Sequence, residues 1–142
     1  MIFFNKKPSI LLVWLNTLIR KVYTFFEKIR WQSYYISINH RFKKFGKSVV
    51  IDYGVQFGGP ENISIGNNVF IGKNAMINAG KGGSIVIDDG AAIGANTTII
   101  TWNLDNLSNQ GLTRSVNKNT FKRVFIGKGV GVGYNVTINP GV

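Results

Sequence analysis

The sequence predicts a mainly β fold, a parallel β-solenoid preceded by an amphipathic α-helix, and three observations lead to it. Residues 51–142 repeat with a period of six, and most repeats open on isoleucine. All 17 glycines lie at or after Gly46. Residues before that point instead carry apolar side chains at helical spacing. We therefore expect a helical arm over 1–47 and a solenoid of about three to four coils over 48–142, with an excursion loop at 102–123.

Composition excludes several kinds of site. The chain has no cysteine and one histidine, so it has neither a disulfide framework nor a cysteine or three-histidine metal centre. No metal site is predicted. Its 17 Lys+Arg against 6 Asp+Glu give a formal charge of +11. Most of that excess lies in residues 1–50, where Glu27 is the single acid, so the arm is strongly basic and the repeat region is nearly neutral.

The arm is expected to form one helix that begins at Ser9, whose hydroxyl suits an N-cap. A single apolar stripe follows at spacings of four and three: Leu11, Leu15, Leu18, Val22, Phe25 and Ile29. The uninterrupted apolar run from Ile10 is far shorter than the roughly 20 residues that span a bilayer. We therefore expect a retained helix that lies flat on a surface.

The stripe on this arm has three candidate partners. Residues 9–47 mix aromatic and basic side chains, which suit peripheral contact with an anionic membrane surface. The stripe would equally pack on the chain's own body or on a sister subunit. Nucleic acid is the least favoured partner, because no recognition motif accompanies the aromatic and basic residues.

The repeats themselves can be read unit by unit. They are IDYGVQ, FGGPEN, IGNNVF, IGKNAM, INAGKG, IDDGAA, IGANTT, IITWNL, IGKGVG, VGYNVT and INPGV, beginning at residues 51, 57, 65, 71, 77, 87, 93, 99, 126, 132 and 138. The first position is always apolar, the second is often Gly, the fourth is mostly Gly or Asn, and the fifth is mostly Val, Ala or Thr.

Each position has a physical reason. A short strand followed by a sharp corner needs a residue that tolerates positive φ, which Gly and Asn do best. The first-position isoleucines would stack on one another in a shared interior, with the small fifth residue beside the corner. One such unit buries nothing alone, so coils must stack, three units to a coil.

This pattern resembles the hexapeptide-repeat acyltransferases, whose repeat is apolar–Gly–x–x–small–x. The segments IGNNVFIGKNAMI and VFIGKGVGVGYNVTINPGV carry the resemblance, which covers about residues 48–142. It implies a left-handed β-helix, a homotrimer, and acetyl-CoA as co-substrate with no permanently bound cofactor. The most similar members are sugar O-acetyltransferases of capsule, exopolysaccharide and lipopolysaccharide clusters.

The resemblance also implies where ligands bind. The acyl-CoA donor would lie along the solenoid at Gly131, Gly133 and Tyr134. The sugar or glycan acceptor would sit near Asn78 and Asn103. On the excursion loop, Arg114, Lys118, Lys122 and Arg123 would meet CoA phosphates or an acidic glycan, or belong to an arm that embraces the next subunit.

The chain departs from the family's pattern at the expected catalytic position. Relatives carry a histidine where the excursion loop leaves the coil, whereas here Trp102 or Leu104 stands there. Asp105 is the only carboxylate on that loop and is the candidate replacement base. His40, in the arm, would have to reach a neighbouring subunit's cleft. Gly131 also replaces a common Trp, and relatives continue for another coil beyond Val142.

Two functions follow. The first is acetyl-CoA-dependent O-acetylation of a sugar in surface-polysaccharide biosynthesis, by a chain that is truncated or impaired or that uses another base. The second is a non-catalytic trimeric scaffold, or pseudoenzyme, at the membrane surface. In either case we expect a cytoplasmic protein at the inner face of the membrane.

Overall fold

The computed structural model describes residues 9–104 and 119–142. The chain divides into two compact units, one ending at Ile36 and one covering Ser37–Val142. The first consists of most of helix α1 (Ile10–Ile38). The backbone N–H of Leu12 donates to Ser9 Oγ at 3.3 Å, which confirms Ser9 as the N-cap.

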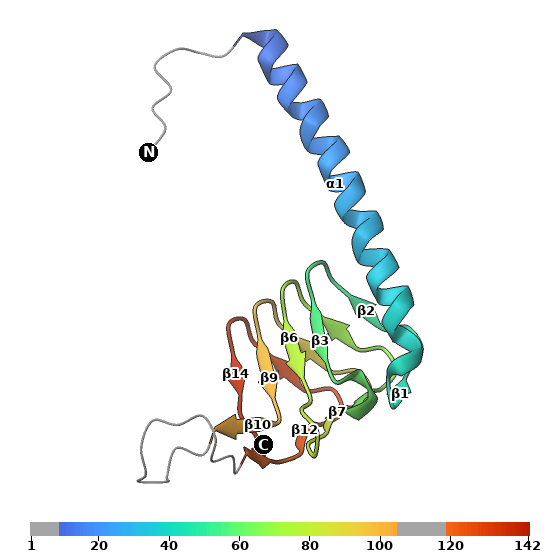
Figure 1. The fold of residues 1–142 in the computed structure, drawn as a ribbon, viewed down its shortest axis with the longest axis vertical. Coiled ribbons are helices and arrows are strands. Elements are labelled where there is room, and N and C mark those ends of the chain that lie inside the picture. The colour runs from blue at the N-terminus through green and yellow to red at the C-terminus, as the bar shows by residue number, and fades with distance from the viewer. Residues whose placement is uncertain (1–8, 105–118) are drawn as a thin grey trace. The chain divides into compact units, whose positions relative to one another are not determined.

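The second unit is a parallel β-solenoid, as the repeat predicts (Figure 1). It opens with a short 3₁₀ helix, η1 (Asn39–Arg41), and contains a second, η2 (Pro60–Asn62). Three four-stranded parallel sheets make up its faces. The first holds β1 (Lys44–Phe45), β4 (Ile63–Ile65), β7 (Ile85–Ile87) and β12 (Val124–Ile126). The second holds β2 (Val50–Ile51), β5 (Phe70–Ile71), β8 (Ala92–Ile93) and β13 (Gly131–Val132). The third holds β3 (Gln56–Gly58), β6 (Met76–Asn78), β9 (Thr98–Ile100) and β14 (Thr137–Ile138), which Figure 1 shows side by side.

Successive strands along the chain step from one sheet to the next, so each coil contributes one strand to every face. Four strands per sheet correspond to about four coils. The strand pairing places first-position residues directly above one another: Ile65 on Ile87, Ile71 on Ile93, and Ile77 on Ile99. All six are completely buried, which confirms the predicted isoleucine columns.

The corners are formed as predicted, with one exception. Positive φ occurs at eight of the nine fourth-position glycines and asparagines: Gly54, Asn68, Asn74, Gly90, Asn96, Gly129, Asn135 and Gly141. The ninth, Gly80, does not have positive φ. The structure also shows a further unit before the eleven, FGKSVV at residues 45–50, in which Phe45 pairs with Ile65 and Ser48 takes the corner at φ 55°.

Side chains at one corner link three coils. Lys47 N–H donates to Asn67 Oδ1 at 2.8 Å, and Asn67 N–H donates to Asp89 Oδ1 at 2.7 Å. The Asn67 side-chain amide donates to the same carboxylate oxygen at 3.2 Å. The backbone hydrogen bond from Asn67 is the main cause that lowers the pKa of Asp89 below its ordinary value.

This carboxylate gives the solenoid a predicted acid sensitivity. Because the pKa is lower in the folded than in the unfolded state, Asp89 stabilises the fold above its ordinary pKa, and that stabilisation is lost as pH falls through the folded-state value. In urea unfolding followed from neutral pH into the acid range, Asp89→Asn is expected to flatten the acid limb. Asp52→Asn is the control, because the hydrogen bond that Asp52 Oδ1 accepts from Tyr53 N–H joins neighbours in the chain. Identical acid limbs in wild type and Asp89→Asn would contradict this role.

Candidate functional site at the exit of the third coil

The excursion loop leaves the solenoid through an antiparallel hairpin. Strand β10 (Trp102–Leu104) follows β9 directly and pairs with β11 (Asn119–Phe121), which leads back into β12. Trp102 lies opposite Phe121 at the base of this hairpin. The sequence predicted an excursion over 102–123 but not that its two ends pair.

Thr101 ties the hairpin to the preceding coil. It is fully buried, and its Oγ1 accepts a hydrogen bond from Gly80 N–H at 2.9 Å. Its own N–H donates to the Asn78 carbonyl at 3.3 Å, and its carbonyl accepts from Lys122 N–H at 2.9 Å. The residue before the hairpin thus contacts both the 78–83 turn and the returning strand.

The glycines of the 78–83 turn leave space for the aromatic rings of the hairpin. A Cβ on Gly80 would lie 2.9 Å from both Trp102 Cδ1 and Phe121 Cε1, and one on Gly82 would lie 3.3 Å from the Phe121 ring. A side chain on Gly83 would overlap Thr101. Gly80 is therefore kept small by packing against rings, and the positive φ of this turn falls at Gly82, at 93°, instead of at the fourth position.

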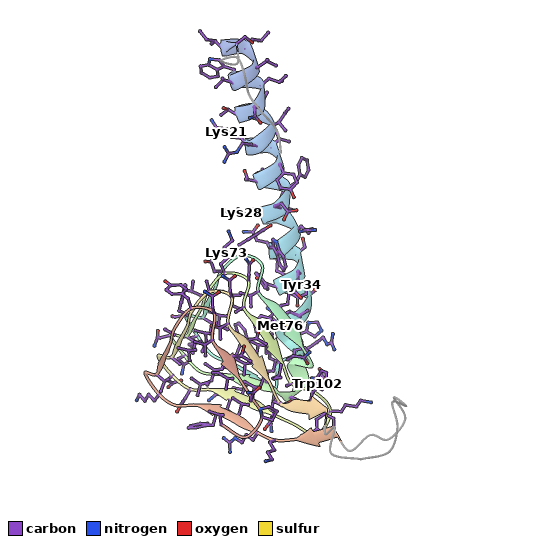
Figure 2. The ribbon with its side chains drawn as sticks, turned by 90° about the vertical axis from the view of Figure 1, so that its left-hand side faces the viewer. Lys21, Lys28, Tyr34, Lys73, Met76 and Trp102 are labelled. Atoms are coloured by element: carbon purple, nitrogen blue, oxygen red, sulfur yellow. The ribbon has the colours of Figure 1, made fainter. Side chains whose placement is uncertain are left out.

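Trp102, labelled in Figure 2, is one of the two residues, with Leu104, that stand where the resemblance expects histidine, and its ring atom Cδ1 lies 2.9 Å from where a Cβ on Gly80 would be. Its indole N–H can donate a hydrogen bond but cannot accept a proton, so Trp102 cannot act as a general base. Leu104 pairs with Asn119 through β10, and its side chain is outside the described part of the structure. Asp105 is outside the described residues as well.

The two asparagines predicted for the acceptor site come from different strands, Asn78 from β6 and Asn103 from β10. Asn78 ends β6 and pairs with Gly58 on one side and Ile100 on the other. A Cβ on Gly58 would lie 2.7 Å from the Asn78 amide, so that amide lies over the glycine of the coil before it. Asn103 pairs with Thr120 in the hairpin. These contacts give Asn78 a structural role, and a role in acceptor binding stays a prediction.

The residues predicted to bind CoA lie on the fourth coil. Gly131 pairs with Ala92, and no atom lies within 4 Å of where its Cβ would be. The space beside the Gly131 backbone is therefore open. The Gly133 carbonyl accepts a hydrogen bond from the buried Thr97 hydroxyl at 2.9 Å, and Tyr134 is 76% exposed. Gly131 lies in the second sheet, whereas Trp102 follows a strand of the third, so the two predicted half-sites lie on different faces.

The charged residues predicted for these half-sites lie partly outside the described part of the chain. Of the predicted basic residues, Lys122 and Arg123 are exposed between β11 and β12, and Arg114 and Lys118 lie outside the described residues. His40 lies on η1, exposed. Residues 9–104 and 119–142 contain no group of three acidic or histidine side chains able to hold a metal ion. Within the same ranges, no helix combines the length and apolarity needed to cross a bilayer.

Phe121 is the site residue that the sequence interpretation missed. Two features pointed to it: aromatic residues, Trp102 and Phe121, stand at the two ends of the excursion, and a run rich in glycine stands at 80–83.

No protein family, curated protein or solved structure matches the chain.

Proposed function

We propose that this chain is an acyltransferase that moves an acetyl group from acetyl-CoA to a sugar hydroxyl in surface-polysaccharide biosynthesis. The observation that carries the proposal is the hexad itself: buried first positions, glycine second positions packed against the next coil, and positive-φ corners. That combination supports kinship with the hexapeptide-repeat acyltransferases, together with their left-handed coil and homotrimer. The proposed location is the cytoplasm, at the inner face of the membrane.

The proposed reaction divides between the two half-sites. Acetyl-CoA would bind along the fourth coil, where Gly131 and Gly133 leave the backbone accessible and Tyr134 offers an exposed ring. The sugar would bind near Asn78 and Asn103 of a neighbouring subunit, so that a cleft between subunits of the proposed homotrimer would bring the sugar hydroxyl to the thioester. A base takes the hydroxyl proton, the sugar oxygen attacks the thioester carbonyl, the C–S bond breaks and the CoA sulfur leaves as thiolate that takes up a proton. We assign Asp105 as the base, because the indole of Trp102 cannot accept a proton.

A specific observation favours a second function, a non-catalytic trimeric scaffold. Trp102, one of the two residues that stand where the resemblance expects histidine, packs against Gly80 together with Phe121, an arrangement that fills the turn rather than exposing a reactive group. A chain that kept the fold and lost the chemistry would have such a substitution.

Release of CoA from acetyl-CoA in the presence of candidate glycans separates the two functions. The enzyme proposal expects turnover that Asp105→Asn lowers about a hundredfold, while Asp52→Asn leaves it unchanged. Trp102→His is expected to raise turnover if the site is intact. No release with any acceptor, together with no acetyl-CoA binding by calorimetry, would end the enzyme proposal. Failure of Trp102→His to gain activity would then favour the scaffold.

A further inference from the structure

Helix α1 exposes an unusually broad apolar surface. The stripe from Leu11 to Ile29 is joined by a second row at seven-residue spacing: Leu12, Ile19 and Phe26. Every one of these side chains is exposed, including Leu11 at 77% and Phe26 at 63%. Together the rows cover about half of the helix circumference. In water, a surface of this kind needs an apolar partner.

The width of this surface argues against a simple pairing of helices. A two-stranded coiled coil buries a narrow seam at the a and d positions, and its neighbouring positions are commonly charged. Here Leu12, Ile19 and Phe26 continue the apolar surface past that seam. A helix that sinks half its circumference into a lipid monolayer uses the whole of such a surface.

The charges lie where a lipid headgroup layer would meet them. Lys21 and Lys28 are seven residues apart, on one flank of the apolar surface, and both are exposed (Figure 2). Arg30 lies on the other flank, and Arg20 lies opposite the apolar rows. The helix has one acid, Glu27, and Arg30 holds its carboxylate at 2.8 Å. The charged residues of the helix all lie within residues 20–30 and are mostly cationic, which makes this part of the helix complementary to anionic phosphate groups.

These positions also set the orientation of the helix. Arg20 and Lys21 fall near the middle of the apolar segment, where a crossing helix would carry them into hydrocarbon at a high free-energy cost. In a helix that lies in the interface, the same side chains extend along the surface to the headgroups. The aromatic ring of Trp14, 72% exposed, suits the boundary between headgroups and acyl chains.

We propose that α1 lies in the plane of an anionic lipid bilayer, with its leucine rows toward the acyl chains and Lys21 and Lys28 at the level of the phosphates. This inference does not depend on the acyltransferase proposal. It assigns the membrane contact to the first three-quarters of the helix, Ile10 to Arg30, which carries the exposed apolar rows.

Vesicle flotation of the full-length chain tests the proposal. Vesicles of phosphatidylcholine with phosphatidylglycerol are expected to carry the protein to the top of the gradient, and vesicles of phosphatidylcholine alone to carry much less. Lys21→Gln combined with Lys28→Gln should lower the partition coefficient roughly thirtyfold. The matched control, Lys73→Gln with Lys81→Gln, removes the same charge from exposed positions of the solenoid and should leave partitioning within about twofold. Raising salt from about 0.1 M to about 1 M should weaken binding, because the Debye length falls from about 10 Å to about 3 Å.

A second pair of variants tests the apolar rows. Leu15→Gln with Val22→Gln should abolish flotation, while Thr17→Gln with Thr24→Gln, on the polar face, should preserve it. Circular dichroism checks that the helix is retained in each variant. The proposal is overturned if the wild-type chain ignores anionic vesicles, or if both lysine pairs reduce flotation equally. It is also overturned if Leu15→Gln with Val22→Gln leaves flotation intact. If the only effect of that double variant is to dissociate an oligomer in the absence of lipid, the apolar surface belongs to a contact with a second copy of the chain and the proposal is likewise overturned.

Discussion

Replacing Ile77 with alanine is expected to destabilise the solenoid by about 2–5 kcal/mol, one of the two largest effects of a single substitution that we predict. Ile77 is completely buried and lies between Phe57 of the coil before and Ile99 of the coil after. Truncation to Ala removes contacts on both sides and leaves a cavity that two rows of backbone hydrogen bonds prevent from collapsing. A urea denaturation curve with unchanged slope and a lower midpoint would measure the loss.

The neighbouring residue provides the control. Met76 lies in the same strand, pairs with Gln56 and Thr98, and points outward at 40% exposure (Figure 2). Met76→Ala is expected to change the unfolding free energy by only about 0.5 kcal/mol. If the two alanine variants lose similar stability, the inward and outward faces of this strand have been assigned wrongly, and the isoleucine column cannot be the core.

Most of the solenoid could be predicted because each position of the hexad has a local cause. Isoleucine is needed where the coil faces inward, and Asn or Gly is needed where φ is positive, so a single sequence shows both requirements directly. Asn96 and Gly90 belong to different repeats yet share one backbone geometry, at φ 57° and 71°. The repeat is therefore visible without any knowledge of which strands pair.

The first coil was harder to see for an equally local reason. FGKSVV places Phe45 in the isoleucine position and Ser48 at the corner, and neither residue is the usual one for its position. Pairing with β4 supplies the missing constraint, since Lys43, at the entry to β1, donates its N–H to the Ile63 carbonyl at 3.1 Å. Pairing with the next coil thus holds residues 45–50 in the repeat conformation, although Phe45 and Ser48 are not the usual residues at their positions.

The candidate site could be located but not described from the sequence. The break in the repeat after Ile99 predicted where the chain leaves the coil. The pairing of Trp102 with Phe121, and their packing on Gly80, depend on residues that are far apart in the chain and follow no period. Gly80 shows the difference most clearly, because the hexad predicts a corner there and the structure uses the missing side chain to admit aromatic rings.

Gly94→Ala is the second substitution expected to be severe, at about 3 kcal/mol. Gly94 occupies the second position of its repeat, where a Cβ would overlap the backbone carbonyl of Gly133 and lie 2.9 Å from the Tyr134 nitrogen. Because both obstacles are backbone atoms, the methyl group can be accommodated only by lifting the fourth coil from the third. That movement would break the hydrogen bond from Gly94 N–H to the Val132 carbonyl, at 2.9 Å, and the one from the Thr97 hydroxyl to Gly133.

Gly133, which holds the same repeat position one coil later, provides a control in which alanine is not expected to lower the unfolding free energy. Gly133 is the second residue of its own repeat, and the nearest atom to its missing Cβ is Cγ2 of Val136, at an ordinary 3.9 Å. Gly133→Ala is therefore expected to be neutral or to stabilise by up to about 1 kcal/mol, since alanine restricts the unfolded chain more than glycine does. Urea unfolding of the two variants compares them under identical conditions. Equal losses of unfolding free energy would show that the second position requires glycine for the backbone conformation of its own turn. A loss confined to Gly94→Ala would show that glycine is required there because the next coil approaches closely.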